Sequence, residues 1–300
     1  MGLFNYSKPG PGISKDAPKK KGIFLYFELF GRKLSKLISV NLIYLLCSIP
    51  MMILYFLIFL LTLPNFFSFA LNSAELTQEG ITYFTVILSI LLSVLCTATL
   101  GSGPASASLA YIFREYSKEE HVWLWSTFFG KMKENFKQEM IVAVLDLVFV
   151  FFSSFALGFY FNQYIQTGST LWFALTLLLG IFSALFVFMH YYIHQLIVTF
   201  ENKLKHILKN SLLFVMSTLL QCILLSAFII GIMYLVFIVL MDVNPVIPIA
   251  VLLIILISFL RFPVEFYIHS AVKKILNLEN KEEVTDEEEV VFSDSHGSEK

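Results

Sequence analysis

The sequence predicts an all-α polytopic membrane protein, a bundle of six transmembrane helices arranged as three hairpins. Composition is the first reason. Hydrophobic residues make up 57% of the 300 residues and charged residues only 14%, whereas soluble domains carry about 25% charged residues. The second reason is that Lys and Arg are absent from three long stretches, 37–113, 138–202 and 210–260. Soluble, disordered and disulfide-rich classes are therefore excluded.

Each stretch without Lys or Arg has room for two membrane-spanning helices and a turn, since one span needs about 20 apolar residues. The six predicted spans are Leu37–Leu63, Ile81–Leu100, Met140–Phe161, Leu171–Phe200, Ser211–Met241 and Pro245–Phe262. The turns that join consecutive pairs of spans, 64–80, 162–170 and 242–244, contain no basic residue.

The distribution of basic residues also predicts the orientation. All Lys and Arg residues lie in the remaining connections or in the two termini. Because basic residues are retained on the cytoplasmic side of membrane proteins, both termini and the long loop 114–139 are expected in the cytoplasm. The three turns within the hairpins are expected outside.

Three flanking segments surround the predicted membrane domain, 37–278. Residues 1–22 form a basic arm rich in Pro and Gly. Residues 23–36 are aromatic and end in cations, which is typical of an amphipathic interfacial helix on the membrane surface. Residues 279–300 hold nine acidic residues against two Lys. Such a segment has no apolar core to bury, so we expect a disordered acidic tail.

Polar side chains inside the spans are the candidate substrate-binding residues, because ionisable groups at membrane depth are costly and often functional. They are Asp146, His190, His194, Gln195, Arg261 and Glu265. All of them are expected in the cytoplasmic half of the bundle. Asp146 either takes part in binding a substrate or proton, or is protonated or held by a polar residue of another helix.

Two pairs of these residues have helical spacing. His190 and His194 are four residues apart and share a helix face; the pair could bind a metal ion, but two ligands alone are a weak signal. We interpret them instead as interfacial histidines bonded to headgroups or to the backbone. Arg261 and Glu265 have the same spacing and are interpreted as an ion pair at the helix end, with an inward-facing polar cavity as the alternative.

The stretch 97–108, T-A-T-L-G-S-G-P-A-S-A-S, is dense in small residues. Small residues allow close approach of helices. Alternatively, Gly101 and Gly103, next to Pro104, interrupt the second span and free carbonyls that could bind a solute, as in broken-helix transporters. Both interpretations remain open at the level of sequence.

No arrangement of residues predicts catalysis. The chain has no Ser-His-Asp set in one compartment, and the Gly-rich stretch lacks the Lys of a phosphate-binding loop. Cys47, Cys96 and Cys222 are far apart and are interpreted as packing residues. We therefore expect no enzyme activity, no cofactor and no metal. The basic segments are expected to face anionic lipid headgroups rather than nucleic acid.

Two blocks of sequence resemble a known family. The first is M-G-L-F-N-Y-S-K-P-G-P-G-I-S-K-D-A-P at the N-terminus, continuing into F-L-Y-F-E-L-F-G-R-K-L-S-K-L-I. The second is G-P-A-S-A-S-L-A-Y at 103–111 with R-E-Y-S-K-E-E-H at 114–121. Together they resemble the YesL family of bacterial integral membrane proteins. The resemblance implies a bacterial plasma-membrane location and a loose link to carbohydrate uptake and breakdown, and it transfers no site residue.

Two functional hypotheses follow. The first is a non-enzymatic accessory protein for carbohydrate uptake or utilisation, acting with a carbohydrate permease, because the sequence carries no energy-coupling motif. The alternative is a small secondary transporter whose polar site lies in the cytoplasmic half of the bundle. The sequence indicates no oligomeric state.

Overall fold

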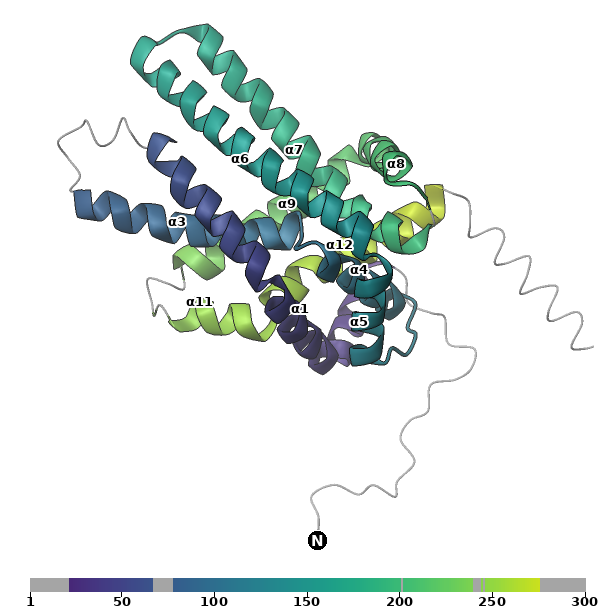
Figure 1. The fold of residues 1–300 in the computed structure, drawn as a ribbon. Helices are drawn as coiled ribbons and strands as arrows, with labels where there is room; N and C mark the ends of the chain where they lie inside the picture. Colours follow the sequence, from purple (N-terminus) through teal and green to yellow (C-terminus); the bar gives the residue numbers. More distant parts are fainter. Residues whose placement is uncertain (1–21, 67–77, 201, 240–243, 245, 276–300) are drawn as a thin grey trace, which may run out of the picture.

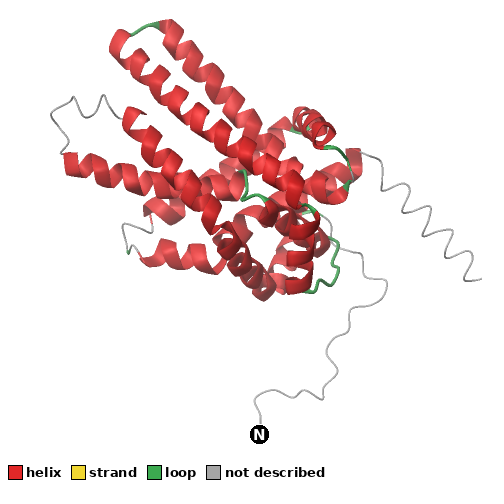
Figure 2. Ribbon diagram, viewed as in Figure 1, coloured by secondary structure: helices red, strands yellow, loops and turns green. Residues whose placement is uncertain are grey.

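The computed structural model describes residues 22–66, 78–200, 202–239, 244 and 246–275. Within these ranges all regular structure is helical (Figure 2). The basic arm before residue 22 and the acidic tail 279–300 lie outside the described residues, as do most of the first and third predicted turns.

Six segments are long and apolar enough to cross a membrane, which confirms the predicted fold class. They are Phe24–Phe66, Glu79–Thr99, Phe136–Thr167, Thr170–Thr199, Leu219–Phe237 and Val246–Lys274. Each predicted span overlaps one of these segments, so the sequence pattern identified the spans correctly and misplaced mainly their ends.

The first helix, α1 (Ile23–Phe66), joins the expected interfacial segment to the first span without a break. The predicted boundary at residue 36 is wrong, because the basic residues there are good helix formers and no Pro or turn residue separates the two parts. Leu29 and Leu37 are fully buried in a cluster with α4, α5 and α12. The segment 23–36 therefore packs against protein along one side.

The second span ends at a break. Helix α3 (Gln78–Thr99) stops before Gly101, and α4 (Pro104–Ser117) begins at Pro104. Most residues of α4 are buried, because this helix contacts α1, α5, α6, α7 and α12. The small residues of α4 allow these close contacts. The predicted interruption of the second span is thus present.

The loop 114–139 is largely helical. It contains the end of α4, all of α5 (Leu124–Glu134) and the first turn of α6 (Phe136–Thr167). Helix α7 (Thr170–Thr199) follows after a turn much shorter than the predicted 162–170. Gly168 adopts a left-handed conformation with φ of 62° and ends α6, a role that glycine fills without a Cβ penalty.

The last hairpin is irregular. The predicted fifth span is divided into α8 (Leu204–Ser217) and α9 (Leu219–Tyr234), which is followed by the π-helical η1 (Leu235–Val239). Thr218 separates α8 from α9 because it leaves helical geometry, with φ of −129°. The sixth span comprises α11 (Val246–Val251), the π-helical η2 (Leu252–Leu256) and α12 (Ile257–Ile275). It continues past the predicted end at Phe262.

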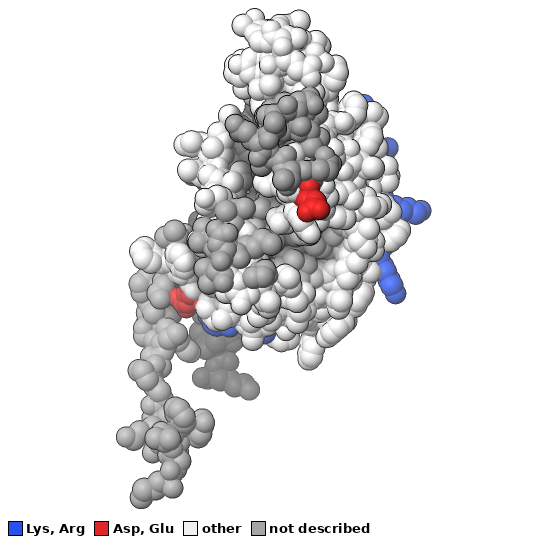
Figure 3. All heavy atoms as spheres, turned by 90° about the vertical axis from the view of Figure 1, so that its left-hand side faces the viewer, with Lys and Arg blue, Asp and Glu red and all other residues white. Residues whose placement is uncertain are grey.

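The helices meet around α4 and α12, and the far end of the α6–α7 hairpin extends away from the other helices (Figure 1). Figure 3 views the molecule from the left-hand side of Figure 1, toward the free ends of α3 and α11. This face is mainly uncharged, and its Lys and Arg atoms lie at the right-hand and lower edges of the view.

Candidate functional site

The break between α3 and α4 is the centre of the candidate site. Gly101 and Gly103 have φ of 101° and 72°, values that L residues other than glycine rarely adopt. The amide of Gly101 donates to the carbonyl of Cys96 over 3.1 Å. After this turn, Pro104 occupies the first position of α4, where a missing N–H costs nothing.

A broken helix leaves carbonyls without helical partners, and side chains from three other helices hydrogen-bond to them. Arg261 Nη1 of α12 donates to the carbonyl of Thr99 over 3.1 Å. His194 Nε2 of α7 lies 2.6 Å from the carbonyl oxygen of Leu100. The Tyr55 hydroxyl of α1 donates to the carbonyl of Gly101 over 3.4 Å. The end of α3 is therefore held by protein groups.

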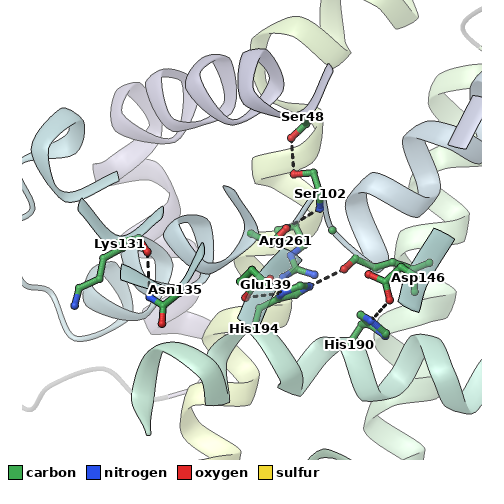
Figure 4. Close-up of polar contacts among 12 residues, drawn as sticks. Ser48, Ser102, Lys131, Asn135, Glu139, Asp146, His190, His194 and Arg261 are labelled. Atoms are coloured by element: carbon green, nitrogen blue, oxygen red, sulfur yellow. Dashed lines mark hydrogen bonds and ion pairs between the residues drawn. The ribbon is translucent and has the colours of Figure 1, made fainter. Parts of the chain in front are cut away.

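Hydroxyl groups hold the other side of the break. The amide of Ser102 donates to Ser106 Oγ over 2.7 Å. Ser48 Oγ of α1 donates to Ser102 Oγ over 2.7 Å (Figure 4). Tyr44 of α1 reaches Ser106 Oγ at 3.2 Å and the carbonyl of Thr97 at 3.2 Å. These contacts explain why residues 102–108 are rich in serine.

His194 bridges the break to Glu139 in the first turn of α6. Its Nδ1 lies 3.0 Å from Oε2 and 3.1 Å from Oε1 of Glu139. A carbonyl oxygen can only accept a hydrogen bond, so Nε2, which faces Leu100, carries a hydrogen. The other nitrogen faces a carboxyl group, so a second proton lies between His194 and Glu139. The pair is either imidazolium with carboxylate or neutral imidazole with carboxylic acid.

His190 and Asp146 form a second pair on the same two helices, one turn away from the first pair along α7 and two turns away along α6. His190 Nδ1 donates to the carbonyl of Phe186 over 2.8 Å, and Nε2 lies 2.7 Å from Asp146 Oδ1. This short contact is an ion pair without hydrogen-bond alignment, since neither atom has a hydrogen-bond partner among the described residues.

The two pairs follow from the antiparallel arrangement of α6 and α7 (Figure 4). Glu139 and Asp146 are seven residues apart on α6, which is two turns, and His190 and His194 are one turn apart on α7. Asp146 and His190 lie the same number of residues from the turn at Gly168. The hairpin register therefore brings each carboxyl group opposite one imidazole.

Arg261 and Glu265 complete the cluster from α12. Arg261 Nη2 donates to Glu265 Oε1 over 2.8 Å, as the helical spacing predicted. Glu265 also interacts electrostatically with His194 and Glu139. Within the described residues, neither Arg261 Nε nor Glu265 Oε2 has a hydrogen-bond partner. The pair thus keeps an unused donor and an unused acceptor in the interior.

The six groups of the cluster are almost completely buried. Glu139, His194, Arg261 and Glu265 are 0% exposed, and Asp146 and His190 are 1% exposed. Each of the three buried carboxyl groups has one basic side chain beside it, His194, His190 or Arg261. Such pairing is what a water-poor interior requires, because an unpaired buried charge is very costly.

The structure corrects part of the sequence interpretation. It brings Asp146, His190, His194, Arg261, Glu265 and Gly101 into one cluster around the break. The expected contact of the two histidines with headgroups is wrong, because both are buried against carboxyl groups from α6. The expected bonds to the backbone are present, at the carbonyls of Phe186 and Leu100. Gln195 does not join the cluster: it is buried, but its Oε1 has no hydrogen-bond partner among the described residues. Gly103 packs instead toward Ala143 of α6.

Sequence reasoning missed Glu139, Tyr44 and Tyr55. The predicted third span begins at Met140, so the sequence places Glu139 in the cytoplasmic loop 114–139 and not in the membrane. The signal that could have found it is the matched spacing of Glu139 and Asp146 against the two histidines across one hairpin. His269, which shares a helix face with Glu265, interacts electrostatically instead with Lys118, Arg114 and Lys273. Among the described residues no three His, Cys, Asp or Glu side chains are grouped as a metal site requires.

Comparison with known proteins gives one finding. Residues 82–157 match the model of a family described as "Protein of unknown function, DUF624". The matched region runs from α3 through the break and α4 to the middle of α6, so it contains Gly101, Glu139 and Asp146 but none of the residues of α7 and α12. No curated protein and no solved structure matches the chain.

Proposed function

We propose that this multi-pass protein is a proton-linked carrier in the plasma membrane of a bacterium, with both termini in the cytoplasm. The observation that carries the proposal is the pair of buried His–carboxyl contacts, Glu139–His194 and Asp146–His190, at a broken helix. Chains of Asp, Glu and His in the membrane are the usual elements of proton relays in transporters. Discontinuous helices supply the solute site in many secondary carriers.

A purely structural role would not account well for this cluster. Buried ion pairs are often no more stabilising than packed apolar side chains, because desolvation offsets the attraction between the charges. Burying three such pairs around one break costs desolvation free energy, whereas a few serine hydroxyls could cap the same helix end without that cost. The arrangement is better explained if the charges change their partners during function.

The described conformation is a closed one in this proposal. Arg261 and His194 occupy the carbonyls of Thr99 and Leu100, which are the positions where hydroxyl donors of a solute would bind. A polyhydroxylated solute would displace His194 from Leu100 and bind the unused atoms of Arg261 and Glu265. Displacement would also disturb the contact with Glu139, so solute binding and proton binding would be linked.

The test measures solute-dependent proton movement in proteoliposomes loaded with a pH-sensitive dye. A panel of mono- and disaccharides is chosen because of the resemblance to the YesL family. We expect at least one sugar to acidify the lumen with the wild-type protein. His194→Gln and Asp146→Asn should reduce the rate at least tenfold, because each removes one proton site. His206→Gln is the matched control, since His206 is exposed on α8.

Two outcomes would contradict the carrier proposal. One is the absence of a response to the whole panel by wild-type protein that is folded and correctly inserted. The other is an unchanged response in both His194→Gln and Asp146→Asn. Either result would favour the second candidate function.

The second candidate is an accessory protein of a carbohydrate permease, without transport of its own. The observation that favours it is the α6–α7 hairpin, whose far end extends from the bundle (Figure 1). Only 6% of the most apolar 18-residue stretch of α7 is buried. In this proposal the exposed side of α7 packs against a helix of the permease. In this case uptake by the permease should fall when Leu178 and Phe182, exposed on α7, are replaced by Ala, and should be insensitive to Asp146→Asn.

A further inference from the structure

A strongly basic pocket lies where α4, α5, α6 and α7 end together. Its volume is about 920 Å³. Five cationic side chains line it: Arg114, Lys131, Lys133, Lys137 and Lys203. The acidic lining residue among those described is Glu134. This site is separate from the buried cluster, although Gln138 in its wall directly precedes Glu139.

Two of the five cations are already paired. Lys131 Nζ donates to Glu134 Oε2 over 2.7 Å. Arg114 contacts Glu115 at 2.9 Å. Burial raises the pKa of Glu115, but the adjacent cations Arg114 and Lys118 lower it, and the pKa lies below its usual value. Glu115 therefore stays ionised and neutralises Arg114 near neutral pH.

The other three cations, Lys133, Lys137 and Lys203, have no ion-pair partner among the described residues. They line the same pocket as the first turn of α6, which starts without a side-chain cap. Uncapped amides at a helix N-terminus attract anions. The cations and the helix end together form an anion site. Its positive charge exceeds that of a single surface lysine.

An apolar cavity of about 400 Å³ adjoins the basic pocket. It lies between α7 and α8 and is lined mainly by Leu196, Phe200, Leu213 and Phe214. Phe200 and Asn202 line both cavities, so the two share a wall and lie side by side. A hydrogen bond of 3.0 Å from Gln138 Nε2 to the carbonyl of Asn202 holds the boundary between them.

We propose that this composite site binds one anionic phospholipid, with its phosphate in the basic pocket and an acyl chain in the apolar cavity. A basic site next to an apolar groove fits an amphipathic ligand better than a soluble phosphate, which would leave the groove unused. Basic pockets between transmembrane helices are suited to lipid headgroups for this reason. The inference does not depend on the carrier proposal.

The test measures lipid binding to the purified full-length protein in detergent by native mass spectrometry. The probes are phosphatidylglycerol, phosphatidylcholine and inorganic phosphate. We expect one phosphatidylglycerol molecule to bind preferentially. Its affinity should fall about 30-fold in Lys137→Gln/Lys203→Gln, given the usual contribution of a cation near a charged headgroup. The matched control Lys205→Gln/Lys209→Gln removes the same charge from exposed positions of α8 outside both cavities.

A groove variant separates the lipid from a soluble anion. Leu213→Trp fills the apolar cavity and leaves the pocket lysines in place. It should lower the affinity for phosphatidylglycerol. Equal weakening by the control pair would mean diffuse surface attraction and would overturn the site. Competition by inorganic phosphate at similar concentration, together with no effect of Leu213→Trp, would overturn the lipid assignment. Equal binding of phosphatidylcholine would do the same.

Discussion

His194 is held from two sides, by the carboxyl group of Glu139 and by the carbonyl of Leu100. Neither contact alone would fix the ring, but the two together determine which nitrogen faces the broken helix. Glu139 also lies in the first turn of α6, where the helix dipole favours a negative charge. The His194–Glu139 pair thus lies between the first turn of α6 and the carbonyl of Leu100, which a solute would have to reach in the proposed carrier.

Gly101 gives a sharp test at the level of a single residue. A Cβ there would lie 2.8 Å from His194 Nε2 and would collide with Ser106 Oγ, and φ of 101° is itself strained for alanine. We expect Gly101→Ala to destabilise the protein by about 2 kcal/mol or more, measured as thermal unfolding in detergent. Gly180→Ala is the control, because nothing lies within 4 Å of its Cβ position. Equal stability of the two variants would contradict the close packing at the break.

At the scale of the element, the sixth span depends on one side chain of α1. The π-helical η2 leaves carbonyls outside the regular helical pattern, and Asn41 Nδ2 donates to the carbonyls of Leu252 and Leu253 over 3.0 and 2.9 Å. The amide of Ser258 donates to Asn41 Oδ1 over 3.0 Å. Asn41 therefore replaces the missing helical hydrogen bonds on both sides of η2.

Replacement of Asn41 by Leu should destabilise the protein by about 3 kcal/mol, because buried backbone groups lose their partners. Thermal unfolding of the purified protein and hydrogen exchange at residues 252–258 would measure the effect. Asn162→Leu is a suitable comparison, since Asn162 only accepts a hydrogen bond of 3.3 Å from Gln166 one turn away. If exchange at 252–258 is not faster in Asn41→Leu, the clamp does not stabilise η2.

At the scale of the whole molecule, the two ends of α6 differ in charge. The end at Phe136 adjoins the basic pocket, whereas the end at Thr167 leads into a turn without basic residues. Alkaline phosphatase is active only outside the cytoplasm, so a fusion after Gln166 should be active and a fusion after Trp125 should be inactive. The reverse pattern would invert the proposed topology, and activity at both positions would contradict the six-span arrangement.

The acidic tail gives a second test at this scale. Residues 279–300 carry a net charge of −7 and few large apolar side chains, so we expect them to be dispensable for folding. A chain truncated after Asn277 should be expressed and inserted at wild-type levels, as measured by quantitative immunoblotting of membranes. Loss of the protein on truncation would show that the tail is needed for folding or for a stabilising partner.

The class of the fold and the number of spans could be predicted from the sequence, because both depend on local properties. Apolar stretches partition into the bilayer on their own, and basic residues mark the ends of each hairpin. The break at Gly101 and Gly103 is one of two interpretations that the sequence leaves open, since small residues also favour close helix packing. The structure shows both the break and the close contacts of α4. The pairing of Arg261 with Glu265 followed from the geometry of one helix.

The partners of His190 and His194 were decided only by the tertiary structure. Which faces of α6 and α7 meet depends on the turn at Gly168 and on the rotation of each helix, and neither is encoded in hydropathy. Arg261 reaches Thr99 only because α12 packs against the end of α3. The sequence by itself therefore determined a six-helix membrane bundle with a weak point in its second span, because these properties are local. Only the packing of four helices around that point gathered ionisable side chains there, because buried charges are stable only with the partners that packing supplies.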